Sequence, residues 1–169
     1  MSFLQRVARL RVSLGFAASV IAIWLARPTD RTLAAGAAVA IAGEAMRVWA
    51  AGHLEKGREV TTSGPYAFTR HPLYLGSALI GAGLAIAAAS WIVAALVIGY
   101  LGLTLTAAIR TEEAHLTEKF GAAYPDYRGG RHGGERRVFS LDRALRNREY
   151  RAVAGLMLVL AVLLWKARP

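Results

Sequence analysis

The sequence predicts an all-α integral membrane protein, a bundle of four to five transmembrane helices in one domain spanning 1–169. The first observation is composition: 55% of the residues are hydrophobic, yet the net charge is +10, and apolar blocks alternate with basic ones along the chain. That alternation is typical of membrane proteins, whose loops collect Lys and Arg. The second observation is that Leu73–Ile109 contains no charged residue. As one helix it would be about 55 Å long, far more than a bilayer core, so it must fold back.

The apolar segments give the order of the elements. The first lies between Arg11 and Arg27, and the second is rich in Ala and Gly, which allow helices to pack closely. The uncharged segment divides near Ala89-Ser90-Trp91, which predicts a tight hairpin of the third and fourth helices. Ser140–Tyr150 predicts a short interfacial helix before a last, marginal span. We expect spans at about 12–27, 33–51, 73–89, 91–109 and 152–165.

The distribution of Lys and Arg predicts the orientation of the chain. Basic residues gather before the first span, between the second and third, and after the fourth, whereas the opposite side carries few. The amino terminus and the two polar segments 64–76 and 110–128 are therefore expected at the cytoplasmic face.

Composition also argues against two kinds of partner. A pI near 10.8 suits nucleic-acid binding, but no nucleic-acid-binding fold or basic-aromatic pattern accompanies it. The chain has no cysteine, and His53, Glu55, Lys56 and Glu59 lack the spacing of metal ligands, so no metal is expected. These four residues instead predict a solvated loop.

Two polar motifs flank the predicted hairpin, whose geometry places both at the same rim of the bundle. Residues 64–76 read GPYAFTRHPLYLG, and the second motif begins RTEE at Arg110 and continues FGAAYPDYR from Phe120 to Arg128. Polar groups beside lipid are costly unless protein or ligand satisfies them. Carboxylates bind an ammonium, Arg and His bind a carboxylate, and aromatic rings bind a planar base or a sulfonium, so a zwitterionic ligand with a ring system suits this set.

Together the motifs resemble the isoprenylcysteine carboxyl methyltransferase family and its phospholipid methyltransferase relatives, in their small, prokaryotic-type form. The resemblance covers about Gly64 to Arg128, where RHPLYLG precedes the hairpin and the paired acids and FGAAYPDY follow it. It implies a bacterial inner-membrane enzyme that binds S-adenosylmethionine at the cytoplasmic ends of its last helices. It also implies an amphipathic or lipid-like methyl acceptor, of isoprenylcysteine carboxylate or phospholipid amine type, that arrives from the bilayer.

The resemblance assigns roles residue by residue. The cofactor-binding set it implies is Tyr66, Arg70, His71, Tyr74, Leu75, Gly76, Glu112, Glu113, Tyr124 and Tyr127. Arg110 would face the acceptor, and Arg110 and Glu113 are the expected catalytic residues. The chain departs from the family pattern after Arg128, where GGRHGG at 129–134 replaces a Val-Pro-like stretch.

The expected chemistry is an in-line displacement at the sulfonium methyl, which depends on positioning more than on acid-base work. An amine acceptor would need to lose a proton, with Glu113 or a tyrosine assisting. Two alternatives stay open: a nicotinamide-dependent membrane reductase related to sterol reductases, and a non-catalytic membrane lipid-binding protein.

Several of these residues also have structural interpretations. His71, before Pro72, could cap the third helix. Glu112 and Glu113 would oppose the helix dipole if the fourth helix ended there, which favours a functional role. Glu44 and Arg47, at i and i+3, predict a structural pair, whose contribution to the site stays open. Gly76, Gly81 and Gly83 suit either close helix packing or a ligand that approaches the backbone.

Overall fold

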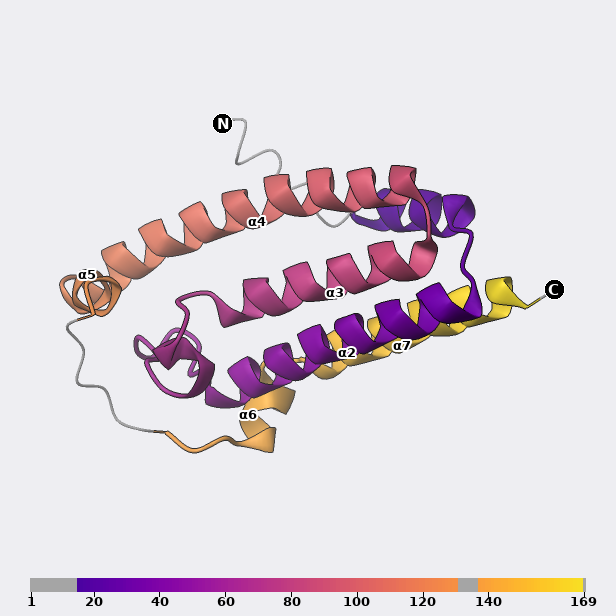
Figure 1. Cartoon of the computed structure of the whole chain (residues 1–169). Coiled ribbons are helices and arrows are strands. Elements are labelled where there is room, and N and C mark those ends of the chain that lie inside the picture. Colours follow the sequence, from indigo (N-terminus) through magenta and orange to yellow (C-terminus); the bar gives the residue numbers. More distant parts are fainter. Residues whose placement is uncertain (1–14, 131–136, 169) are drawn as a thin grey trace.

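The structure is a computed structural model that describes residues 15–130 and 137–168, and in these ranges it contains helices and no strand (Figure 1). The first described helix is Gly15–Leu25. It is followed by α2 (Asp30–His53), the short 3-10 helix η1 (Gly64–Ala67), α3 (Pro72–Ala88), α4 (Trp91–Phe120), α5 (Ala123–Arg128), α6 (Leu141–Arg146) and α7 (Tyr150–Ala167). Three parts of the prediction lie outside the described residues: the position of the amino terminus, the start of the first span, and most of the GGRHGG segment.

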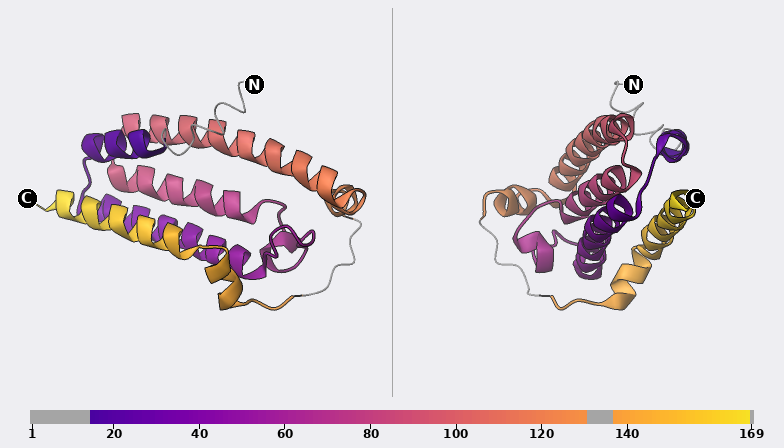
Figure 2. Two further views of the ribbon diagram at one scale, coloured as in Figure 1. Left: turned by 180° about the vertical axis from the view of Figure 1, so that it is seen from behind. Right: turned by 45° about the vertical axis from the view of Figure 1, so that its right-hand side comes forward.

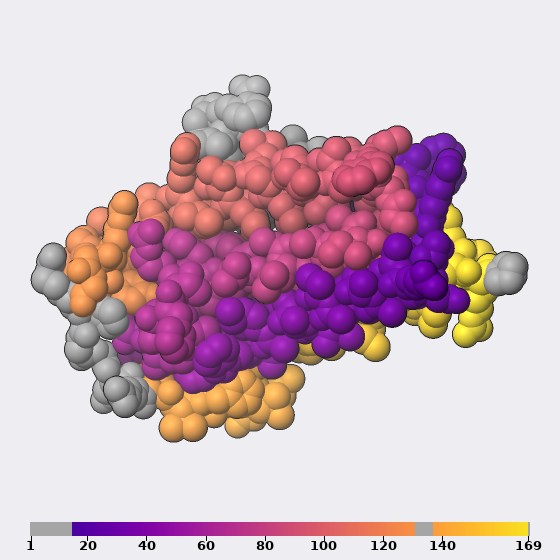
Figure 3. Space-filling view, in the orientation of Figure 1, coloured from indigo at the N-terminus to yellow at the C-terminus, as the bar shows by residue number. Residues whose placement is uncertain are grey.

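The long helices identify the chain as an integral membrane protein. Among the described helices, α2, α4 and α7 are long and apolar enough to cross a bilayer, and Gly15–Leu25 and α3 are shorter apolar helices. These helices lie alongside one another, with α4, α3 and α2 side by side on one face (Figure 3). The prediction of an all-α membrane bundle is confirmed.

The predicted tight hairpin joins α3 to α4 through only Ala89 and Ser90. Ala89 ends α3 in the left-handed conformation, with φ 48°, and its N–H donates to the carbonyl of Ile86. Ser90 is extended, and its carbonyl accepts the first hydrogen bond of α4 from Ala94, at 2.9 Å. Trp91 follows with 92% of its surface exposed, as expected of an aromatic anchor at a membrane interface.

Helix α4 extends well beyond the expected end of the span at 109. Its 30 residues correspond to about 45 Å, so its last turns stand outside a bilayer core of about 30 Å. The sequence interpretation ended the span at the first charge, but Ala, Leu, Glu and Lys all favour helix and propagate it to Phe120. Glu112 and Glu113 therefore lie about two turns before the helix end, and the expected conflict with the helix dipole does not arise.

Small residues hold α2 against α3. A Cβ added to Gly43 would lie 2.7 Å from the carbonyl oxygen of Gly76, and one added to Gly76 would lie 2.7 Å from that of Gly43. Gly36 and Gly83 face each other one level further along the same interface. Such close backbone approach is typical of membrane helix pairs, and it selects packing as the role of these glycines.

The carboxyl-terminal part of the chain attaches to the end of α2. Ser140 N–H donates to the carbonyl of Gly52, and the Asn147 side chain donates to the carbonyls of Ala51 and Leu54 at 2.9 and 3.0 Å. These bonds satisfy carbonyls that a helix terminus leaves without partners. From here α7 runs back along α2, so that α2 lies between α3 and α7 (Figure 2).

The sequence predicts a solvated loop at His53, Glu55, Lys56 and Glu59, and this prediction is wrong for His53 and Glu55. His53 is buried, with Nδ1 2.9 Å from the carbonyl oxygen of Trp49 and its ring against that of Phe139. The Glu55 carboxylate lies among three arginines from the carboxyl-terminal segment. Sequence spacing gave no sign that this segment would return and cover the loop.

Candidate functional site

The two polar motifs meet at the end of the bundle where α3 begins and α4 ends, here called the rim (Figure 1). A single carboxylate oxygen joins them. Oε1 of Glu113 lies 3.1 Å from His71 Nε2, accepts from the Tyr124 hydroxyl at 3.2 Å, and accepts from Arg70 Nη1 at 3.4 Å. We call Arg70, His71, Glu113 and Tyr124 the Glu113 cluster.

His71 contributes to this cluster because of how α3 starts. It occupies the N-cap position with Pro72 at the first helical position, and its side chain makes no capping hydrogen bond. Its backbone carbonyl accepts from Leu75 N–H at 3.0 Å, so the backbone alone begins the helix. The imidazole is therefore available to Glu113, and the Tyr74 ring lies 5.7 Å from it.

Helix α5 closes the rim. Gly121 interrupts α4 with a φ of 53°, a conformation that favours glycine, and the chain turns into Ala123–Arg128. Tyr124 and Tyr127 are both buried, and the Tyr127 hydroxyl donates to the backbone carbonyl of Tyr66 at 2.6 Å. The Tyr127 bond fixes the η1 segment against α5.

The phenols of the rim are donors at neutral pH. Burial raises the pKa of Tyr124 to about 12, and the negative charge of Glu113 and its hydrogen bond add to this effect. Burial also raises the pKa of Tyr66, with a further contribution from the Glu112 charge, and the pKa of Tyr127. A tyrosine that takes a proton from an amine acceptor is therefore disfavoured here.

Four predicted site residues stand apart from the Glu113 cluster. Arg110 and Glu112 are exposed, and neither forms a hydrogen bond or ion pair with another residue in the described part of the chain. Leu75 is 43% exposed. Gly76 is buried against α2, where an added Cβ would lie 2.5 Å from Arg47 Cγ, so it packs helices together and does not open toward a ligand.

A second polar cluster surrounds Arg47, and the sequence predicted only its Glu44 contact. Arg47 Nε lies 3.9 Å from Glu44, the predicted partner, but 2.6 Å from Glu149, which is 102 residues away. Arg47 Nη1 also donates to Ser77 Oγ at 2.6 Å and toward the carbonyl of Leu73 at 3.4 Å. Arg47 thus ties α2, the start of α3 and the start of α7 together. No local pattern indicated Glu149.

Glu44 lines an apolar groove between α2 and α7 with a volume of about 480 Å³. The groove residues on α2 include Ile41, Ala45 and Val48, and they lie on the side of the helix away from the Gly36 and Gly43 contacts with α3. The groove is therefore separate from the Glu113 cluster. No group of three or more His or acidic residues with metal-ligand geometry occurs within residues 15–130 and 137–168.

Comparison with known proteins shows which family the chain belongs to. A family model described as phospholipid methyltransferase matches residues 10–123, well over half of the chain. The chain belongs to the phospholipid methyltransferase family. The match includes the segment 64–76 and the Glu112-Glu113 pair of this membrane methyltransferase, and it ends before Tyr124 and the α6–α7 region. No curated protein and no solved structure matches the chain.

Proposed function

We propose that this phospholipid methyltransferase family member transfers a methyl group from S-adenosylmethionine to an amphipathic or lipid-like acceptor at the cytoplasmic membrane face. The observation that carries the proposal is the convergence of the two motifs on Glu113. His71 and Glu113 are 42 residues apart in the sequence, and the two segments that contain them place Arg, His, Tyr and Glu side chains together at the rim. Family membership makes methyl transfer the reaction that this set would serve.

The rim residues fit the chemistry of S-adenosylmethionine. The Arg70 side chain is 43% exposed and suits the carboxylate of the cofactor's amino-acid end. Glu112 is exposed and makes no bond inside the described structure, so its carboxylate suits the ammonium. The ring faces of His71 and Tyr74 suit the purine or the sulfonium.

Glu113 acts as a positioning residue in this proposal. Its Oε1 is shared by three donors, so its main effect is to hold Arg70, His71 and Tyr124 in place. Because an ionised carboxylate only accepts hydrogen bonds, its contact with His71 requires the proton on Nε2 of the imidazole. Preorganisation of this kind is what a displacement reaction needs most.

When bound, S-adenosylmethionine would supply an electrophilic methyl group on its sulfonium. Buried Tyr66, Tyr124 and Tyr127 close one side of the rim and exclude water from it. Arg110 projects from α4 less than one turn before Glu113, and its exposed guanidinium, which pairs with no group in the described part of the chain, can orient an acceptor carboxylate or phosphate. Because α4 is a membrane helix up to this level, an acceptor can reach Arg110 laterally from lipid.

The cytoplasmic orientation is supported by the charges of the rim end. Lys56, Arg58, Arg137, Arg143 and Arg146 all lie near the carboxyl-terminal end of α2. An accumulation of Lys and Arg at one end of the spans is the usual mark of the cytoplasmic side.

The proposal is tested by turnover in reconstituted bilayers. The full-length protein would be placed in nanodiscs containing phosphatidylethanolamine, with isoprenylcysteine amphiphiles in parallel samples, and given S-adenosylmethionine with a labelled methyl group. We expect label in the extracted amphiphile of one class and none with heat-denatured protein. Absence of transfer to either class by a folded protein would contradict the proposed acceptors.

A further inference from the structure

A polar pocket lies outside the rim site, beneath the loop that follows α2. It has a volume of about 500 Å³ and is bounded by the loop 54–58 and by α6. Its lining residues are Leu54, Glu55, Lys56, Arg58, Arg143, Arg146 and Asn147. We call it the Glu55 pocket. The residues of its α6 wall lie beyond the end of the family match at residue 123.

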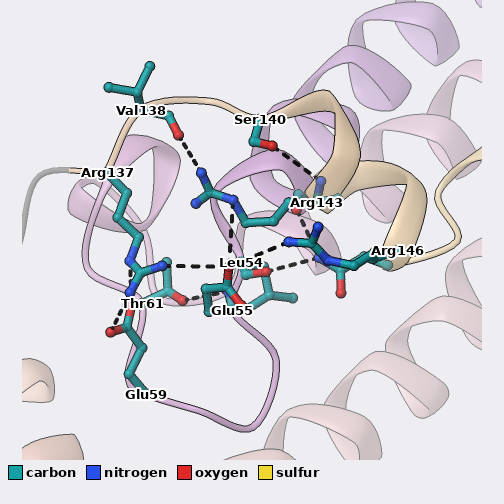
Figure 4. Close-up of polar contacts among 11 residues, drawn as sticks. Leu54, Glu55, Glu59, Thr61, Arg137, Val138, Ser140, Arg143 and Arg146 are labelled. Atoms are coloured by element: carbon teal, nitrogen blue, oxygen red, sulfur yellow. Dashed lines mark hydrogen bonds and ion pairs between the residues drawn. The ribbon is translucent and has the colours of Figure 1, made fainter.

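Positive charge dominates the Glu55 pocket (Figure 4). Oε1 of Glu55 is shared by Arg137, Arg143 and Arg146, at the long distances of 3.6, 3.7 and 3.7 Å. Glu59 pairs closely with Arg137, at 2.7 Å. Among the residues that line the pocket, Lys56, Arg58, Arg143 and Arg146 are cationic and Glu55 alone is acidic, so the lining carries an excess of positive charge.

Arg143, the least exposed of the cations that line the pocket, is held in place by its own hydrogen bonds. Arg143 Nη2 donates to the carbonyl of Val138 at 2.8 Å, and the backbone N–H of Arg143 bonds the Ser140 hydroxyl. Asn147 fixes the other end of α6 to α2. Arg143 Nη1 is buried and has no hydrogen-bond partner among residues 15–130 and 137–168, which leaves a donor unsatisfied on a residue that lines the pocket. A guanidinium with open donors suits the oxygens of a phosphate.

The surroundings indicate where such a phosphate comes from. Leu141 and Leu145, at i and i+4 on α6, are 61% and 49% exposed, and Val138 is 80% exposed. An apolar face on a short basic helix at the end of membrane spans is typical of insertion into the headgroup region. The pocket then lies at the depth of lipid phosphates. Its excess positive charge would repel a headgroup ammonium and favour a headgroup with net negative charge.

We propose that the Glu55 pocket binds the phosphate of an anionic phospholipid through Lys56, Arg58, Arg143 and Arg146. This site is separate from the Glu113 cluster and does not depend on methyl transfer. Binding would hold α6, and with it the start of α7, against the membrane surface. It would also neutralise Arg143 and Arg146, which share the Glu55 carboxylate.

The test uses full-length protein in detergent and measures dissociation constants for short-chain phosphatidylglycerol, for short-chain phosphatidylcholine and for inorganic phosphate. We expect the anionic lipid to bind about tenfold more tightly than the zwitterionic lipid, because both carry the phosphate and only phosphatidylcholine adds an ammonium that the positive charge of the pocket repels. Inorganic phosphate should bind far more weakly than the lipid. Equal affinity for the two lipids, or phosphate binding as tight as that of phosphatidylglycerol, would overturn the proposal.

Variants locate the binding in the pocket. The double substitution Lys56→Gln/Arg146→Gln changes two exposed side chains, so the fold should persist, which circular dichroism would check. We expect it to remove most of the preference for phosphatidylglycerol, whereas Arg151→Gln, an exposed cation on α7 that does not line the pocket, should leave it within about twofold. An equal loss in both variants would show general surface attraction and would contradict a defined site.

Discussion

His71 Nε2 lies 3.1 Å from Glu113 Oε1, a contact that joins the start of α3 to α4. The α3–α4 hairpin brings these residues together because its two-residue turn makes the helices antiparallel neighbours. Tyr124 and Arg70 reach the same carboxylate oxygen from α5 and from the loop before α3. The arrangement thus depends on the membrane hairpin, and each predicted role at the rim can be examined by a single substitution.

Glu113→Gln should weaken S-adenosylmethionine binding about tenfold with the fold retained. The substitution replaces a charged acceptor by a neutral amide, so Arg70, His71 and Tyr124 lose the charge that holds them together. Isothermal titration calorimetry measures the affinity. Glu118→Gln, on an exposed side of the same helix, is the matched control and should bind normally. Unchanged affinity in Glu113→Gln would reject the positioning role.

His71→Ala distinguishes a site role from a capping role. The imidazole makes no capping bond and the backbone already starts α3, so thermal unfolding in detergent should shift little while cofactor affinity falls. The opposite pattern, a clear loss of thermal stability with normal affinity, would show that His71 serves the helix and not the site.

Arg110→Ala should leave both stability and cofactor affinity unchanged and should lower the rate of methyl transfer. The side chain is exposed and contacts no charged or hydrogen-bonding partner within the described residues, so the fold does not depend on it. Single-turnover assays with saturating cofactor measure the rate. Arg110→Lys is expected to retain part of the activity, and a normal rate in Arg110→Ala would make Arg110 a flanking charge only.

Gly76→Ala should destabilise the bundle by about 1–3 kcal/mol, the usual range for overpacking. The added methyl group would lie 2.5 Å from Arg47 Cγ and 2.7 Å from the Gly43 carbonyl oxygen, so α2 and α3 must separate. Gly99→Ala is the control, because nothing lies within 4 Å of a Cβ at that position of α4. Thermal unfolding in detergent checks the pair, and equal stability of the two variants would contradict the packing role of Gly76.

Much of the fold could be predicted from the sequence because membrane helices follow from long apolar runs. The hairpin break at Ala89-Ser90 was predicted because one uncharged run was too long for a bilayer. The end of α4 could not be predicted in the same way, because the first charge marks the edge of the membrane and not the end of the helix. The chain stays helical through Glu112 and Glu113 to Phe120.

The site shows the same division. The meeting of His71 and Glu113 could be expected from the hairpin geometry. The Arg47–Glu149 contact could not, because it joins residues 102 apart and depends on how α7 returns along α2. The pairing of Glu55 with arginines of the carboxyl-terminal segment had no local signal for the same reason. The resemblance assigns Gly76 to the cofactor, and the structure places it at the contact between α2 and α3, a position that depends on how those helices pack.

Calorimetric titration of detergent-purified, folded protein with S-adenosylmethionine, with a reduced nicotinamide cofactor as the parallel titrant, tests the central claim most directly. The rim, with exposed Arg70 and Glu112 beside the His71 and Tyr74 rings, predicts saturable binding of S-adenosylmethionine and none of the nicotinamide. Binding of the nicotinamide alone would contradict the account in favour of a reductase. Binding of neither would contradict it in favour of a non-catalytic lipid-binding protein.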